Sequence, residues 1–231
     1  MSISGITAMI HTWEPKTFDT LYALESFRKY CEENERLITE AAEEQERLHG
    51  PDWHPKTEEE LGEYHEFKRI SRHLHDEIVT PVFRYSCVVM LYTVVERELR
   101  RLCVNLEKEK TPVKLTYKDL KGGILEQISK WCRICCALEL ASFKEFSEIR
   151  DLQKIRDCIV HCNGEVDDSW DKKDILAMKD RYTGFFAWER TEIEIQPEFV
   201  SHMHRQVWSF FLGVFDSLKW DVDPDWKAKQ F

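Results

Sequence analysis

The stretch from Glu148 to Gly164 reads Glu-Ile-Arg-Asp-Leu-Gln-Lys-Ile-Arg-Asp-Cys-Ile-Val-His-Cys-Asn-Gly. Its apolar residues recur three or four positions apart, and this spacing predicts an amphipathic helix with one buried face. The residues on that face are Ile149, Leu152, Ile155, Ile159 and Cys162. The pair Asn163-Gly164 is typical of a helix that ends in a left-handed conformation. The stretch therefore predicts one helix with a defined end.

Three polar residues near that end are candidate catalytic residues. His161 falls in the last predicted turn, where the helix dipole favours a protonated imidazole. Asp157 precedes it by four residues on the same face, so its carboxylate can reach the ring. Arg156 adds a planar set of donors that suits a phosphate group. A cation and a proton-transfer group beside an exposed helix end indicate a phosphodiester site.

The pattern Arg156-Asp157-x-x-x-His161, followed by Asn163-Gly164, resembles the Arg-polar-x(3)-His signature of HEPN-domain proteins. Upstream, Val88–Leu99 resembles the long helix that precedes this motif, and Asp119–Ile124 resembles the turn that opens the intervening helix. The resemblance covers residues 80–219. HEPN proteins are mostly small all-helical dimers, and many are metal-independent ribonucleases of microbial defence and toxin–antitoxin systems.

An Arg followed closely by a His occurs at two other places in the chain. Arg47 and His54 lie on either side of Gly50-Pro51, which indicates a loop. Arg69 and His75 lie in a charged segment with little apolar spacing. Only the stretch around Arg156 combines the motif with an apolar helical face and a terminating Asn-Gly.

The resemblance implies roles for the candidate residues. His161 would transfer a proton at the RNA 2′-hydroxyl or at the leaving oxygen, and Asp157 would orient its ring. Arg156 would hold the phosphate and stabilise the charge that grows on it. Residues five apart lie about 140° around a helix, so Arg156 and His161 do not form a tight pair on one helix. In the family, two motifs meet in a cleft between protomers, and no metal or other cofactor is needed.

Three further residues are candidates for lining the site: Glu96, Arg97 and Asn163. Glu96 and Arg97 interrupt an otherwise apolar helix. One interpretation is a surface ion pair between Glu96 and Arg100, four residues apart. The other, which follows from the resemblance, is that Glu96 or Arg97 faces the Arg156 and His161 site.

The composition limits the functional classes. The net charge of −10 disfavours a general nucleic-acid coat protein, but residues 97–156 carry 14 Lys/Arg against 9 Asp/Glu. A selective RNA site is compatible with that distribution. The longest apolar run, Cys87–Val95, is too short to span a bilayer, and the N-terminus lacks the pattern of a secretory signal. We therefore expect a cytoplasmic protein without membrane contact, with its eight cysteines reduced.

The predicted fold is all-α, with a helical N-terminal arm over residues 1–79 and a HEPN-like helical domain over 80–231. Proline 81 is predicted to break or kink a helix that begins after Thr57, and Ser142 is predicted to cap the motif helix. The other predicted elements are helices at 17–49, 82–108, 124–136 and 167–182, a small hairpin within 185–195, and a last helix from Pro197.

The cluster Cys132, Cys135 and Cys136 has two interpretations. Its Cys-x-x-Cys spacing is that of a zinc site, which Cys158 and Cys162 could complete. Buried core cysteines are the favoured interpretation, because a single Cys-x-x-Cys is a weak signal.

The expected function is that of a homodimeric endoribonuclease that acts on RNA, as a defence effector or a toxin restrained by an antitoxin or regulatory protein. Two alternatives remain: a non-catalytic module that binds RNA or protein, and a purely structural helical bundle.

Overall fold

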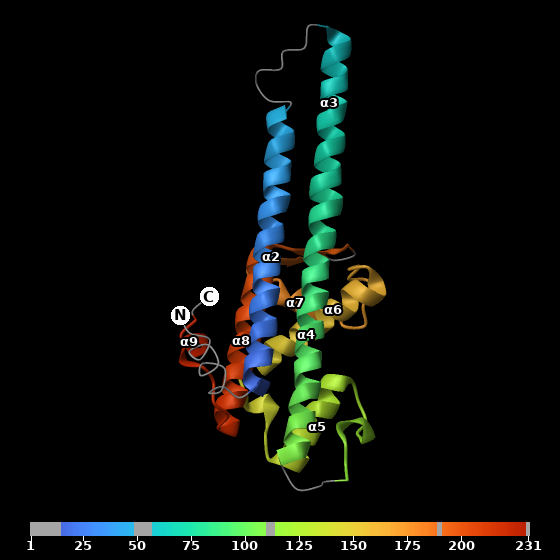
Figure 1. The fold of residues 1–231 in the computed structure, drawn as a ribbon. Helices are drawn as coiled ribbons and strands as arrows, with labels where there is room; N and C mark the ends of the chain where they lie inside the picture. The colour runs from blue at the N-terminus through green and yellow to red at the C-terminus, as the bar shows by residue number, and fades with distance from the viewer. Residues whose placement is uncertain (1–14, 49–56, 110–113, 189–190, 230–231) are drawn as a thin grey trace, which may run out of the picture.

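The computed structural model describes residues 15–48, 57–109, 114–188 and 191–229 (Figure 1). Within them the fold is all-α with one small two-stranded antiparallel sheet, as predicted. The α-helices are α2 Pro15–Leu48, α3 Glu58–Arg72, α4 Thr80–Glu109, α5 Ile124–Cys136, α6 Phe146–Cys162, α7 Lys172–Met178, α8 Pro197–Leu218 and α9 Pro224–Lys227. A π-helical segment, His73–Val79, joins α3 to α4. Short 3-10 turns cover Tyr117–Asp119 and Leu140–Ser142. The two strands are β1 Phe185–Ala187 and β2 Ile193–Ile195.

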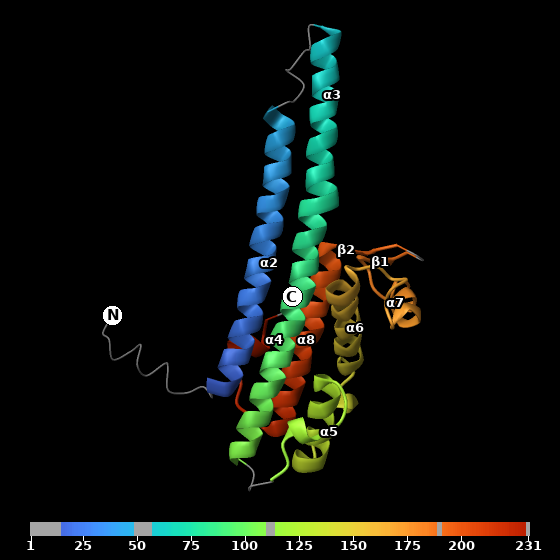
Figure 2. The same cartoon turned by 90° about the vertical axis from the view of Figure 1, so that its right-hand side faces the viewer.

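Two long antiparallel helices dominate the molecule. One is α2, and the other is the continuous helix formed by α3, the π-helical segment and α4 (Figures 1 and 2). Helices α6 and α8 pack against the part of this pair that lies in the body, and α4 contacts α2, α5, α6 and α8. The core is therefore built around α4, from side chains such as Leu91, Val95, Ile155 and Phe210, all at most 1% exposed.

The free end of the helical pair projects beyond the body (Figure 2). We call it the arm: residues 32–48 of α2, α3 and the π-helical segment. No described side chain of the arm is buried. The first half of α2, in contrast, contributes Leu21, Leu24 and Phe27 to the core. The division at residues 79/80 suggested by the sequence thus falls inside a continuous helix, and the start of α2 packs with the body.

Proline 81 was predicted to break or kink the helix, and the helix continues through it without a break. The preceding turn is π-helical, and the Thr80 N–H donates to the His75 carbonyl five residues back. A wider turn accommodates a proline ring that would collide with the carbonyl four residues earlier in a regular α-helix. The start of α3 is as predicted, because the Thr57 hydroxyl accepts from the Glu60 N–H at 3.2 Å.

The continuous helix Glu58–Glu109 contains an 18-residue window with a mean hydropathy of 1.7. By length and composition alone this helix could cross a membrane, and 33% of that window is buried inside the protein. A core helix of a soluble protein meets the same criterion, so this observation is weak evidence for a membrane span.

Two smaller elements differ from the prediction. Ser142 does not cap the motif helix: it lies in a 3-10 turn, and α6 begins at Phe146 with Glu145 at its N-cap. The helix expected over 167–182 is shorter, Lys172–Met178. The hairpin and the last helix are as predicted, since β1 pairs with β2 and α8 begins at Pro197.

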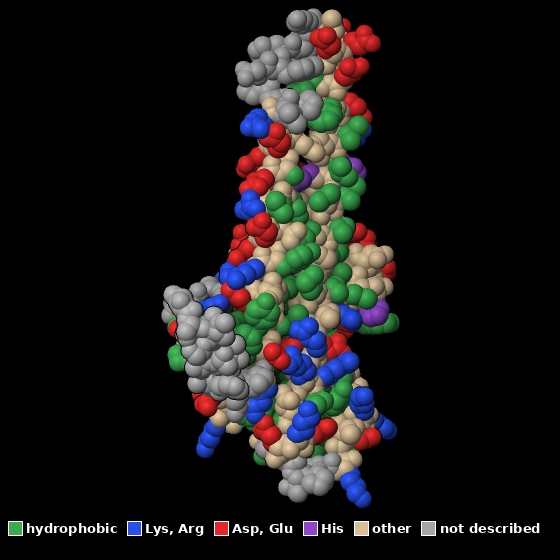
Figure 3. Space-filling model, in the orientation of Figure 1, with side chains coloured by type: hydrophobic (Ala, Val, Ile, Leu, Met, Phe, Trp, Pro, Cys, Tyr) green, Lys and Arg blue, Asp and Glu red, His purple; other side chains and the backbone are tan. Residues whose placement is uncertain are grey.

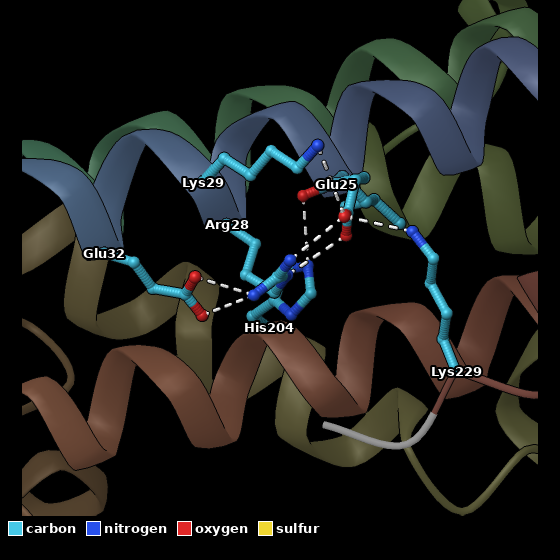
Figure 4. Close-up of polar contacts among 7 residues, drawn as sticks. Glu25, Arg28, Lys29, Glu32, His204 and Lys229 are labelled. Atoms are coloured by element: carbon cyan, nitrogen blue, oxygen red, sulfur yellow. Dashed lines mark hydrogen bonds and ion pairs between the residues drawn. The ribbon is translucent and has the colours of Figure 1, made fainter.

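A polar cluster joins the C-terminal segment to α2 (Figure 4). Glu25 accepts from Arg28 at 3.0 Å and pairs with Lys229 at 3.0 Å. The hydrogen bond from Arg28 is the largest cause that lowers the pKa of Glu25 to about 2. His204 of α8 lies buried beside this cluster, and its Nε2–H donates to the Leu24 carbonyl at 3.1 Å.

Candidate functional site

Arg156 is held between α6 and α4. Its guanidinium carbon lies 5.6 Å from the centroid of the Tyr92 ring, and Nη1 donates to Asp157 Oδ1 at 2.6 Å. Nε is buried and, among the described residues, has no hydrogen-bond partner. The side chain as a whole is 27% exposed. Arg156 is therefore positioned by a ring and one carboxylate, with donor capacity that the described part of the chain does not use.

Tyr92 forms the buried floor under this guanidinium. Burial is the largest cause that raises the pKa of its phenol, and the carboxylates of Glu96 and Asp157 raise it further, while Arg156 and Arg100 act in the opposite direction. The ring thus stays neutral. The charges that act on this phenol therefore come from both α4 and α6.

The predicted ion pair between Glu96 and Arg100 is confirmed, at 2.5 Å. Glu96 thus takes part in the ion pair of the first interpretation, and within the described residues no hydrogen bond or ion pair joins it to Arg156 or His161. Arg97 is 55% exposed and donates to the buried Glu98 at 2.7 Å. No contact within the described residues joins Arg97 to Arg156.

A groove of about 530 Å³ runs along the C-terminal half of α4. We call it the basic groove. It is lined by Thr93, Glu96, Arg97, Arg100, Arg101, Val104, Asn105 and Lys108. Four of these residues are cations and one is an anion. Arg100, Arg101 and Lys108 were not among the predicted site residues, although their spacing on one helix could have revealed them.

His161 lies in the last turn of α6 and is exposed. Its ring centroid is 6.5 Å from that of Trp170, with the two planes at 43°. Trp170 is 91% exposed, an unusual position for a side chain with so much apolar surface. An imidazole and a fully accessible indole therefore lie side by side at the end of the motif helix.

The structure does not bring Asp157 and His161 together. Asp157 bonds to Arg156, and no hydrogen bond joins it to His161 in the described residues. Nor does any described contact join Arg156 to His161: the arginine faces α4, whereas the histidine lies beside Trp170. This separation agrees with the angle expected for residues five apart on a helix.

The end of α6 is fixed as predicted. Asn163 has φ 52° and Gly164 has φ 84°, and the Gly164 N–H donates to the Cys158 carbonyl at 3.1 Å. A Cβ added to Gly164 would overlap the hydroxyl of Tyr85, which itself donates to the Ile193 carbonyl at 2.5 Å. Asn163 is thus an exposed capping residue two positions after His161, and its neighbour Gly164 contacts α4 and β2.

The cysteines are distributed through the protein. Cys132 and Cys136 are buried and Cys135 is partly exposed. Within the described residues no group of three or more His, Cys, Asp or Glu side chains has the arrangement of a metal site. Cys31 and Cys87 lie with their sulfurs 3.4 Å apart between α2 and α4, and this contact and burial raise the pKa of the Cys31 thiol.

Comparison with known proteins gives no match: no family model, no curated protein and no solved structure is similar to this chain.

Proposed function

We propose that the protein is a metal-independent endoribonuclease that acts as a homodimer and cleaves RNA by attack of the 2′-hydroxyl. The observation that carries this proposal is the layout of α6. Arg156 is fixed over Tyr92 with unused donors, while His161 lies at the same helix's end beside a fully accessible indole. The Arg-polar-x(3)-His resemblance supports the same two residues.

Each residue would have a distinct role in the reaction. Arg156 binds the scissile phosphate and stabilises the charge on its non-bridging oxygens. Asp157, bonded to the guanidinium, orients Arg156 rather than the imidazole. Trp170 stacks on a base of the single-stranded RNA, because any nucleobase presents a face to an exposed aromatic ring.

His161 transfers the proton in this scheme. The 2′-oxygen attacks phosphorus and loses its proton to a base, and the departing 5′-oxygen gains a proton from an acid. The products are a 2′,3′-cyclic phosphate and a 5′-hydroxyl end. Such a reaction requires no metal ion. An enzyme of this kind would serve as a defence effector or a toxin, restrained by a partner protein.

The test compares wild type with His161→Ala and Arg156→Ala on total RNA in the presence of EDTA. Equal helicity and equal mass in solution are checked first. His73→Ala, at a 56% exposed histidine of the arm, is the matched control. We expect cleavage with cyclic-phosphate ends by wild type and His73→Ala, and none by the two site variants. Cleavage by His161→Ala at the wild-type rate would reject the assignment.

One observation favours the alternative, a non-catalytic module that binds RNA or protein. The basic groove is lined by four cations and lies on α4, which does not carry His161. Such a module would bind RNA without cutting it. RNA binding by wild type that persists in His161→Ala, with intact RNA in both samples, would support this alternative over catalysis.

A further inference from the structure

The core of the protein ends, on the side of the arm, in a pair of cysteines. Among the described side chains, Cys31 is the last buried one of α2, and Cys87 is the first buried one of the continuous helix Glu58–Glu109. The arm begins at the residue that follows Cys31. The two cysteines therefore form the layer in which the core stops and the arm starts.

The sulfur atoms of these two residues lie against each other. They are 3.4 Å apart, and the side chains of Cys31 and Cys87 are 8% and 1% exposed. The two sulfurs of a disulfide bond are about 2 Å apart, so the pair has to close by little more than about 1 Å. Rotation of a cysteine about its Cα–Cβ bond moves the sulfur by at least that much. The packing of α2 on α4 thus already holds the two thiols as neighbours.

A pocket of about 240 Å³ lies beside Cys31, between α2 and α8. Its walls include Cys31, and also Arg28, Glu32 and His204, which are drawn in Figure 4. A water molecule takes up about 30 Å³ in the liquid, so the pocket has room for an oxidant as small as hydrogen peroxide. Cys87 is not part of the pocket wall. An oxidant can therefore approach Cys31 while Cys87 stays enclosed behind it.

Little buried surface holds the two helices of the arm together beyond this pair. Apolar side chains of the arm face the solvent (Figure 3), among them Leu37 of α2 at 48% and Ile70 of α3 at 52% exposure. Polar contacts contribute to the pairing, as where the His75 Nε2–H donates to the Ile38 carbonyl at 3.0 Å. Segments with few buried contacts open readily. A covalent link at the base would limit how far the two helices can separate.

We propose that Cys31 and Cys87 are an oxidation site, at which hydrogen peroxide joins α2 to α4 by a disulfide bond at the base of the arm. Cys31 loses its proton, its sulfur attacks one peroxide oxygen, and the other oxygen leaves as water, which makes Cys31 a sulfenic acid. The sulfur of Cys87 then attacks the Cys31 sulfur and loses its own proton, and the sulfenic oxygen departs as a second water. Two thiols give up two electrons and two protons, and one peroxide becomes two waters.

The surroundings of the pair set when this bond forms. The contact with Cys87, together with burial, raises the pKa of the Cys31 thiol, so little of the reactive thiolate is present at neutral pH. The reaction is therefore slow, and a reducing compartment keeps both thiols free. The bond forms under sustained oxidation and is reversed by added thiol. This inference does not rest on the proposed ribonuclease activity.

The first experiment is peptide mapping of the full chain after treatment with a molar excess of hydrogen peroxide. Free thiols are alkylated in denaturant, and linked peptides are identified by mass spectrometry. The background variant Cys135→Ser/Cys162→Ser lacks the two partly exposed thiols and keeps six of the eight cysteines. We expect the Cys31–Cys87 link in wild type and in the background variant, and a loss of two of the six thiols in the latter. Recovery of Cys87 as a free thiol in both proteins would overturn the proposal.

The second experiment measures whether the bond fastens the base of the arm. On oxidation of the background variant, hydrogen–deuterium exchange should slow at least about threefold in residues 28–38 and 80–90, and should not change in α5 at the other end of α4 (Figure 1). Adding Cys31→Ala or Cys87→Ala, at equal helicity, should abolish both the bond and the slowing. Exchange that is equal before and after oxidation would refute the fastening. The mapping needs no change of either cysteine, so it decides the bond even if an alanine variant unfolds.

Discussion

Arg156 of α6 lies with its guanidinium 5.6 Å from the ring centroid of Tyr92 on α4, a contact between the motif helix and the central helix of the core. Tyr92 is 3% exposed, so the ring cannot move without disturbing the core. The orientation of the proposed phosphate-binding group is therefore fixed by the packing of two helices. A planar cation suits this position, because it can stack on a ring while its edge donates hydrogen bonds.

Arg156→Lys tests this geometry. An ammonium keeps the charge but offers neither a flat face for Tyr92 nor two parallel donors for phosphate. We expect the rate of RNA cleavage to fall about 100-fold, in the range known for loss of one charge-stabilising group. The melting temperature should change little, since the contact with the ring contributes about 1 kcal/mol. Arg69→Lys on the exposed arm is the control and should cleave at the wild-type rate.

Trp170→Ala tests the proposed stacking platform. The indole is 91% exposed, so its removal should leave the free energy of unfolding unchanged within about 0.5 kcal/mol. Loss of one base stack costs about 1–3 kcal/mol, so the dissociation constant for single-stranded RNA should rise about tenfold or more. Fluorescence anisotropy measures the affinity. Trp188→Ala, at a 58% exposed tryptophan of the hairpin, should have no such effect; equal losses in both variants would contradict a specific role for Trp170.

Gly164→Ala tests how the end of the motif helix is held. Alanine at φ 84° is strained, and its Cβ would overlap the Tyr85 hydroxyl. We expect a loss of at least about 2 kcal/mol in the free energy of unfolding by urea. Gly62→Ala is the opposite case: it lies within α3 and a Cβ there would meet no atom within 4 Å. That change should stabilise the helix, by up to about 1 kcal/mol.

His204 should make stability depend on pH. Burial is the largest cause that lowers its pKa from 6.5 to about 4. In the unfolded chain the imidazole takes up a proton below pH 6.5, while the folded protein keeps it neutral. The contribution of His204 to the free energy of unfolding is therefore complete above pH 6.5. As the pH falls to about 4, the free energy of unfolding decreases by up to about 3 kcal/mol.

His204→Gln is the control for this loss, because the amide can still donate to the Leu24 carbonyl. Urea titrations between pH 7 and 4 should show a shallower decline for the variant than for wild type. The pKa of Glu25 is lowered to about 2, so protonation of its carboxylate should further reduce the free energy of unfolding below pH 4.5 in both proteins. Identical slopes between pH 6.5 and 4.5 would contradict the assignment of the titration to His204.

The sequence predicted those parts of the fold that depend on local patterns. The apolar spacing from Ile149 to Cys162 placed α6, and the Asn163-Gly164 pair placed its end, because periodicity and a left-handed cap are local properties. The alternating residues around Phe186 and Glu194 likewise predicted the hairpin. The continuity of the helix at Pro81 was not foreseen for a local reason as well: a π-helical turn has no clear sequence signal, so the proline was expected to break or kink the helix.

The site was harder to predict because it depends on contacts between helices. Asp157 bonds to Arg156, its neighbour in the sequence, and not to His161. Arg156 is in turn placed by the ring of Tyr92, which lies 64 positions before it in the sequence. Trp170 was missed because its importance comes from its exposure, and exposure is a property of the folded chain. The cations of the basic groove could have been recognised from their helical spacing alone.

The π-helical segment His73–Val79 also accommodates a change in the length of the arm without a change in its facing. Deletion of one residue there would let a regular α-helix form and would place Leu74 four positions before Val79, so the two side chains would stay on one face. Removal of seven residues from α3 would shorten the arm by two turns and turn it by only about 20°. The arm can thus lose a single residue at the π-helical segment, or a heptad in α3, and still present nearly the same face.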